Sequence, residues 1–307
     1  MAAIEVMDAA ECWWPQAHLD STMMARLTLA ANRHAGVENV GVPFCMTVEA
    51  EAMGAKIDLG SRENEPNVAV YAMDSVADTD RLSQMDVTAG RAAVCTDAIR
   101  ILRREAPQIP VFANLTGPVS LATSLVDPLL FYRALIKNKE GAHKLMRMVN
   151  QTLLRFGSAL IEAGADVVCI ADPSASGELM GSISFSEFAL PYINDLVVYF
   201  REKYEVPAIV HICGKVQSLG TRLSEIAAEA ISVDSVVNIR MLKQLAPFKI
   251  AMGNIDTHLL ANGVPAGILK NGKRCIKAGT QILAPACGMS TRTPIENIRS
   301  LLKAVSD

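Results

Sequence analysis

The sequence predicts an α/β fold of the (β/α)8 barrel type whose first strand–helix unit is missing or incomplete. Seven short apolar runs, each ending in small or polar residues, alternate with segments of helical periodicity. The runs are continuously apolar, which is typical of parallel strands buried on both faces. Side chains that can bind a metal or a substrate follow several of the runs, and barrels of this type place their functional residues at the C-terminal ends of strands. A doubly wound open sheet is the alternative.

The predicted elements follow in chain order. The strands are expected at 39–44, 109–115, 166–171, 207–212, 231–233, 248–252 and 281–284. Apolar residues at helical spacing predict helices over 145–163 and 193–204. A last helix is predicted from Thr293-Pro294-Ile295-Glu296, in which Thr293 is the expected cap, Pro294 the first helical residue and Glu296 the capping-box acid.

Two segments fit the barrel less well. The helix predicted over about 21–35 needs a strand before it, and only 3–6 is available. We therefore expect a gap in the barrel wall beside the helix that begins at about Ser21. The stretch 56–108 is long for one connection and is expected to make an excursion over the barrel mouth.

Composition sets the broad class. The 307 residues are 50% hydrophobic and carry a formal net charge of −3, which predicts one large globular domain over 1–307. No basic block suggests a nucleic-acid surface, so we expect no nucleic acid as a partner. No apolar stretch reaches about 18 residues, so we expect no membrane span and a cytoplasmic protein. The seven scattered cysteines suit a reducing compartment.

One imidazole and two thiols form the strongest candidate site. His211 and Cys213 are two residues apart on a predicted strand, so their side chains point the same way, and Cys287 follows another predicted strand. Each of these strand ends is close to a glycine, and nitrogen with sulfur donors suits zinc. The alternative is that the cysteines are small core residues and His211 is a hydrogen-bonded strand histidine.

The charge of such a site predicts its chemistry. Two thiolates neutralise Zn²⁺, so the metal would activate water poorly but could bind an incoming thiol as its thiolate. A sulfur held in this way stays nucleophilic and is placed to attack an electrophilic carbon. The predicted reaction is alkyl transfer to sulfur.

Several segments in order carry a resemblance to a known family. They are PQAH at 15–18, VPFCMTVEAEAMGA at 42–55, TGP at 116–118, ADPSASG at 171–177, HICG at 211–214, GNID at 253–256 and LAPACG at 283–288. With them the chain resembles, nearly end to end, the methylcobamide:coenzyme M methyltransferases of the uroporphyrinogen decarboxylase superfamily.

The resemblance implies a barrel with zinc bound by His211, Cys213 and Cys287. It also implies two reaction partners, coenzyme M and a methylated corrinoid protein that carries methylcobamide. Coenzyme M would bind zinc through its thiol and attack the methyl group on Co(III) of the corrinoid protein, which would dock over the barrel mouth.

Five further residues are weaker candidates. Glu49 and Asp172 are candidate catalytic groups after strand ends, but each has a structural alternative, as a helix cap or in a turn. Asn114 and Asn254 could orient a ligand or only satisfy loop backbone. Arg292, five residues after Cys287, could bind a sulfonate or could be a surface arginine.

Three other functions remain open. The first is the opposite direction, in which a methyl donor methylates Co(I) of a corrinoid protein. The second is uroporphyrinogen decarboxylase itself, although no arginine cluster for an acidic tetrapyrrole is found near the N-terminus. The third is an inactive paralogue that binds zinc or a corrinoid.

Overall fold

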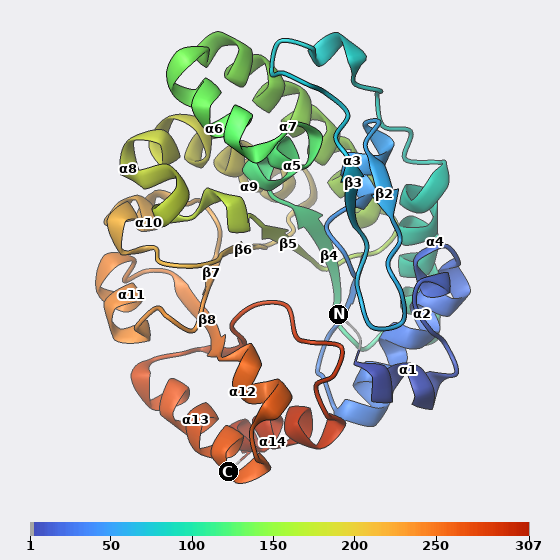
Figure 1. Ribbon diagram of the computed structural model, residues 1–307. Helices are drawn as coiled ribbons and strands as arrows, with labels where there is room; N and C mark the ends of the chain where they lie inside the picture. The colour runs from blue at the N-terminus through green and yellow to red at the C-terminus, as the bar shows by residue number, and fades with distance from the viewer. Residues whose placement is uncertain (1–2, 307) are drawn as a thin grey trace.

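Seven parallel strands curl into a barrel that stays open between its first and last strands (Figure 1). The computed structural model describes residues 3–306, and its main sheet has the order β1-β4-β5-β6-β7-β8-β9. The bounds are Val40–Val42 (β1), Val111–Thr116 (β4), Val167–Ala171 (β5), Ala208–Ile212 (β6), Ala230–Val233 (β7), Ile250–Ile255 (β8) and Ile282–Pro285 (β9). All seven predicted strands are confirmed, with ends that differ by a few residues.

The expected gap in the barrel wall is also confirmed. Within residues 3–306, β1 pairs only with β4, and β9 pairs only with β8. The strand considered at 3–6 is wrong, because this segment enters helix α1 (Ile4–Ala10). Val6, Met7 and Ala10 recur at helical spacing and are all buried, so a helix buries this apolar set on one face.

Helices form an outer ring around the strands in Figure 1. They are α1, α2 (Ser21–Ala30), α3 (Val48–Ala52), α4 (Gly90–Glu105), α5 (Pro118–Leu125), α6 (Pro128–Lys137), α7 (Lys139–Glu162), α8 (Gly177–Phe188), α9 (Leu190–Tyr204), α10 (Arg222–Glu225), α11 (Ile239–Leu245), α12 (Thr257–Asn262), α13 (Pro265–Ala278) and α14 (Ile295–Ser306). Short turns are η1 (Gln16–His18), the π-helical η2 (Ala31–Ala35), η3 (Thr79–Arg81), η4 (Pro173–Ala175) and η5 (Gln217–Leu219). The predicted helices over 21–35, 145–163 and 193–204 are confirmed by α2 with η2, by α7 and by α9.

The start of the last helix differs from the prediction. Helix α14 begins at Ile295, and the buried hydroxyl of Thr293 has no hydrogen-bond partner. The amide of Ile295 instead donates to Glu5 Oε2 of α1 over 2.8 Å. A carboxylate from a distant helix therefore satisfies a helix-terminal amide that the sequence pattern assigned to Thr293.

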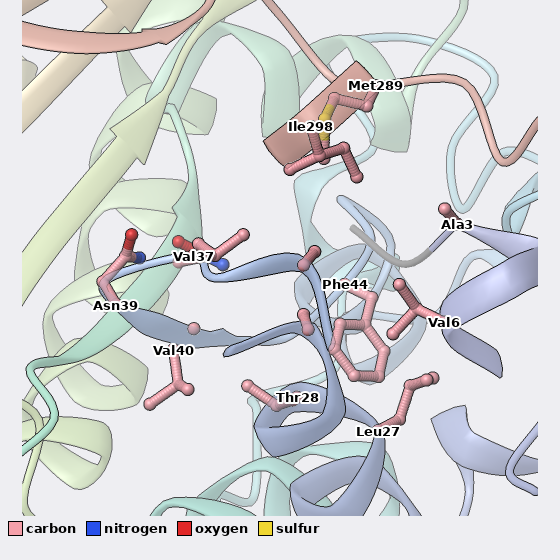
Figure 2. Close-up of a pocket in the computed structure, with 14 residues that line it drawn as sticks. Ala3, Val6, Leu27, Thr28, Val37, Asn39, Val40, Phe44, Met289 and Ile298 are labelled. Atoms are coloured by element: carbon pink, nitrogen blue, oxygen red, sulfur yellow. The ribbon is translucent and has the colours of Figure 1, made fainter. Parts of the chain in front are cut away.

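An apolar cavity of about 150 Å³ lies beside the gap in the sheet. Figure 2 shows Val6 of α1, Leu27 of α2 and Ile298 of α14 around it. Val40 of β1 and Phe44, which follows β1, complete this part of the wall. The helices at the two ends of the chain thus cover the position where an eighth strand would close the barrel.

The long connection 56–108 contains an antiparallel hairpin and helix α4. The hairpin strands are β2 (Lys56–Asp58) and β3 (Asn67–Val70). Their connecting loop reaches a cavity that residues from the C-terminal ends of the barrel strands also line, because Glu65 of the loop lies in its wall. The predicted excursion over the barrel mouth is this hairpin, whereas α4 is an ordinary helix of the outer ring.

No single helix among residues 3–306 is both long and apolar enough to cross a membrane. Helices α5 and α6 reach the required length and apolarity only when they are taken together, and they are bent by 112° relative to each other.

Candidate metal centre and cavity

His211, Cys213 and Cys287 come together at the barrel mouth. His211 lies on β6, Cys213 follows β6, and Cys287 follows β9. Strands β7 and β8 separate these two strands in the sheet, so the curl of the sheet brings Cys287 back toward the other two residues. One potential ligand atom from each of the three residues lies within 4.8 Å of the others.

The ring of His211 is oriented for a ligand at Nε2. Ser232, its register partner on β7, has its Oγ 3.0 Å from His211 Nδ1. If Nδ1 carries the proton and donates it to Ser232, the lone pair of Nε2 is free. Nε2 is buried and has no hydrogen-bond partner among the described residues. A buried ring nitrogen without a partner is costly, and a metal ion would remove that cost.

The two sulfur atoms have the spacing of metal ligands. Cys213 Sγ lies 3.6 Å from Cys287 Sγ, and tetrahedral zinc with bonds of about 2.3 Å would place two sulfur ligands about 3.8 Å apart. The hydrogen bond from Cys213, together with His211, lowers the pKa of Cys287 to about 4. The same hydrogen bond, then burial and Asp234, raise the pKa of Cys213. One thiolate is therefore already favoured in this pair.

Asp234 lies directly behind Cys213. Its Oδ2 is 3.1 Å from Cys213 Sγ and accepts from the amide of Gly214 over 3.1 Å. Burial opposes ionisation of Asp234, but hydrogen bonds from Cys213 and from the amides of Val236 and Gly214 outweigh it and lower the pKa of the carboxyl. Asp234 therefore fixes the position of the Cys213 side chain and of the turn at Gly214.

A cavity of about 410 Å³ opens beside the three donors. Its wall includes His211, Cys287 and Ser232, and most of the remaining wall is apolar, with Phe44, Leu115, Met252 and Pro285 among its residues. A cavity of this size fits a small organic molecule. Asn39, Phe44, Asn114 and Met289 also line the apolar cavity of Figure 2, so the two cavities are neighbours.

The predicted residues Asn114, Asn254 and Arg292 differ in their position relative to the larger cavity. Asn114 lines the larger cavity, where its Nδ2 donates to the carbonyl of Pro43 over 3.1 Å. Asn254 is outside the wall, and its Nδ2 donates to the carbonyls of Asp234 and Val237. Arg292 lies on the rim, where its guanidinium is 2.6 Å from Glu63 of the hairpin loop.

The carboxylates of Glu49 and Asp172 are fully buried and stand outside the wall of the cavity. Glu49 accepts from the amide and the hydroxyl of Thr116, and burial raises its pKa. Asp172 accepts from the amides of Val119 and Ser120 and from the hydroxyl of Ser120. These hydrogen bonds lower the pKa of Asp172, but burial outweighs them and raises it to about 6. Glu49 thus holds Thr116, which lies in the cavity wall, and Asp172 holds the start of α5. A catalytic role for either carboxylate stays a prediction.

Sequence reasoning missed Ser232, Asp234 and Glu65. The first two lie in Ser232-Val233-Asp234, at the end of β7, and the strand-end rule that selected His211 applies equally to them. Glu65 gave no such signal, because it lies in a hairpin loop whose path toward the cavity depends on the tertiary structure.

Comparisons with known proteins agree with this fold and with the enzyme class. The family model for uroporphyrinogen decarboxylase (URO-D) matches residues 1–307. The methylcobamide:CoM methyltransferase MtbA of Methanosarcina acetivorans is 30% identical over 308 residues, which cover 100% of this chain and 90% of that protein. The methylcobamide:CoM methyltransferase MtaA of Methanosarcina barkeri is 30% identical over 305 residues, covering 98% of this chain and 89% of that protein.

A solved methyltransferase from Methanosarcina mazei superposes with a TM-score of 0.91 at 29% sequence identity, and the match covers 100% of this chain and 91% of that one. The predicted barrel type and the predicted methyltransferase class are thereby confirmed. The chain belongs to the uroporphyrinogen decarboxylase (URO-D) family.

Proposed function

We propose that this protein transfers a methyl group from a methylated corrinoid protein to the thiol of a small acceptor, with zinc held by His211, Cys213 and Cys287. Coenzyme M, which the names of the relatives contain, is the reference acceptor. The observation that carries the proposal is the buried, unpartnered Nε2 of His211 beside two cysteine sulfurs 3.6 Å apart. This donor set fits zinc with one position left for a substrate.

When bound, zinc would hold the sulfur of the acceptor as a nucleophilic thiolate. Other residues of the chain hold the proposed ligands in position in the absence of a substrate. Ser232 fixes the ring of His211, and Asp234 fixes Cys213 and the turn after it. Such outer contacts determine the direction of the donor atoms and thus the affinity of the site.

The proposed reaction moves the methyl group from cobalt to sulfur and releases one proton. The acceptor's thiol proton is released, its sulfur forms a bond to the methyl carbon, and the cobalt–carbon bond breaks with its electron pair left on cobalt. The protein aligns the two reactants and excludes water from the reacting sulfur. The apolar wall that includes Phe44, Leu115 and Met252 suits that exclusion.

The direct test is methyl transfer from methylcobalamin, a small stand-in for the methylated corrinoid protein, to coenzyme M by the zinc-loaded protein. We expect the methyl thioether to form and the cob(I)alamin spectrum to appear at equal rates. The Cys213→Ala and Cys287→Ala variants should lose this activity. Cys169→Ala is the matched control, because Cys169 lines the same cavity but lies outside the cluster of three ligands.

Two results would contradict the proposal. One is the absence of methyl transfer to any thiol by a protein shown to contain zinc. The other is methylation of cob(I)alamin from a methyl donor at a rate well above the thiol reaction, which would establish the opposite direction.

A further inference from the structure

The segment 43–47 follows β1 at the open side of the barrel and forms part of the cavity wall. Phe44, Cys45 and Met46 line the larger cavity, and Phe44 also lines the apolar cavity of Figure 2. Among the described residues, β1 pairs only with β4, so no strand of the main sheet borders β1 on its other side. On that side, the segment depends on contacts from outside the sheet.

The side chain of Arg91, on helix α4, makes such contacts. Arg91 is 5% exposed, and its Nη1 donates to Cys45 Sγ over 3.3 Å. Its Nη2 donates to the carbonyl of Thr47 over 3.1 Å and to the hydroxyl of Thr47 over 3.0 Å. Its Nε donates over 2.5 Å to Oε2 of Glu51, which lies on α3. One guanidinium thus connects two residues of the wall segment with the helix that follows it.

The geometry of these contacts requires an arginine. A guanidinium is planar and presents its donors in fixed directions, and the three nitrogens of Arg91 contact three different residues. A lysine ammonium has the same charge, but all its donors are on one nitrogen, so it cannot replace this set of contacts. Because a buried charge that loses its partners is costly, Arg91 and the segment 43–47 hold each other in one arrangement.

A second arginine of α4 makes a comparable set of contacts far from the mouth. Arg103 donates to the carbonyl of Gly164 from Nε over 3.1 Å and from Nη2 over 2.8 Å, and it pairs with Asp166 over 2.5 Å. Gly164 and Asp166 precede β5, at the end of the barrel opposite the mouth. None of these three residues lines the larger cavity. Arg103 therefore provides an internal control for the contacts of Arg91.

We propose that Arg91 is a positioning residue for the acceptor thiol, because it holds the segment 43–47 as a fixed part of the cavity wall. This inference rests on the proposed transfer to a thiol and adds a residue to that site. Arg91 itself is outside the wall and acts through the residues of the segment. The proposed zinc ligands lie on β6 and after β6 and β9, so zinc binding should not depend on Arg91.

Replacement of Arg91 by lysine tests the proposal, with Arg103→Lys as the matched control on the same helix. For the zinc-loaded proteins we would measure kcat and KM for coenzyme M, with methylcobalamin as the methyl donor. The wall contacts the acceptor in the ground state and in the transition state alike, so its displacement should act on KM. We expect KM to rise about tenfold in Arg91→Lys, with kcat within about twofold of the wild type and zinc content unchanged. Arg103→Lys should keep the wild-type KM.

Hydrogen exchange reports on the segment without any substrate. The amide of Glu51 donates over 3.0 Å to the carbonyl of Thr47, which Arg91 also contacts. Amides in 43–51 should therefore exchange faster in Arg91→Lys than in the wild type, while those of β5 and β6 should exchange at the wild-type rate. Thr47→Val removes one acceptor of Arg91 and should raise KM in the same way, but by a smaller factor.

Three outcomes would overturn the inference. The first is a wild-type KM in Arg91→Lys, and the second is an equal rise of KM in Arg103→Lys, which would indicate general destabilisation. The third is unchanged exchange of 43–51 in Arg91→Lys. If Arg91→Lys does not fold, unchanged KM and exchange in Thr47→Val would refute the inference instead. If the wild type methylates no thiol, the proposed function fails, while exchange and the Kd for coenzyme M by calorimetry still test the role of Arg91.

Discussion

Removal of one sulfur ligand should abolish stoichiometric zinc binding. Apparent binding free energies for structural zinc sites with four ligands are about 10–16 kcal/mol, which amounts to about 3 kcal/mol per ligand. Losing Cys213 or Cys287 should therefore weaken zinc binding by on the order of a hundredfold or more. We expect about one zinc per chain in the wild type and almost none in Cys213→Ala and Cys287→Ala after dialysis.

Substitution of Ser232 should also weaken zinc binding, but by less than the loss of a sulfur ligand. Ser232 Oγ lies 3.0 Å from His211 Nδ1, and loss of such an outer contact costs about 10–100-fold in metal affinity. A hydroxyl is a neutral hydrogen-bond partner and so contributes less than a charged one. We therefore expect Ser232→Ala to weaken zinc binding by about tenfold, or about 1.4 kcal/mol, at the lower end of this range. Ser232→Thr keeps a hydroxyl and should recover part of the loss.

The assay is competition for zinc with a chromophoric chelator, backed by elemental analysis of the purified proteins. Cys169→Ala is the control for loss of a thiol, since burial raises the pKa of Cys169 to about 11 and its thiol is outside the ligand cluster. Zinc affinity of wild-type strength in Cys213→Ala or Cys287→Ala would refute the site. Equal affinities of Ser232→Ala and the wild type would refute the orientation of His211 by Ser232.

Two further predictions concern stability. In Gly157→Ala on α7, the new Cβ would lie 2.3 Å from Phe200 Cζ, so overpacking should outweigh the gain in helix propensity and reduce the unfolding free energy by about 1–2 kcal/mol. Gln151→Ala, at an exposed site on the same helix, is the control in guanidinium denaturation. The Asp172 carboxyl, with its pKa raised to about 6, contributes stability below about pH 4 that is lost as pH rises through about 6. The difference in unfolding free energy between the wild type and Asp172→Asn should therefore shift against the wild type by about 2 kcal/mol between pH 4 and pH 7, and a constant difference would contradict the raised pKa.

The sheet was predictable because its strands are buried on both faces. A run such as 207–212 is apolar almost throughout, as a parallel strand covered by helices on both faces requires. His211 and Cys213 were predictable as a pair because side chains two residues apart on a strand point to the same face. Their meeting with Cys287 followed from the rule that strand C-termini share one end of a barrel.

Other features depend on tertiary contacts that local sequence does not contain. The segment 3–6 is too short for its periodicity to distinguish a strand from a helix, and the contact between Glu5 and Ile295 joins residues 290 positions apart. Asp172 follows a strand end, as the rule requires, yet its carboxyl turns to the first amides of α5. The strand-end rule thus identifies the residues near the mouth but not the direction of each side chain.

The open barrel places special demands on Cys287. Its strand, β9, is an edge strand that pairs only with β8 among the described residues, and the loop after Cys287 has no neighbouring strand on its other side. Contacts from the rim replace that strand. Thr291 Oγ1 donates to the carbonyl of Glu63 over 2.8 Å, and the carbonyl of Thr291 accepts from the amide of Ile4 over 2.7 Å.

The ion pair between Arg292 and Glu63 belongs to the same set of contacts. It connects the hairpin loop to the loop that contributes Cys287, a candidate metal ligand. The position of Cys287 after an edge strand thus depends on contacts that reach from its loop to the hairpin loop and to α1.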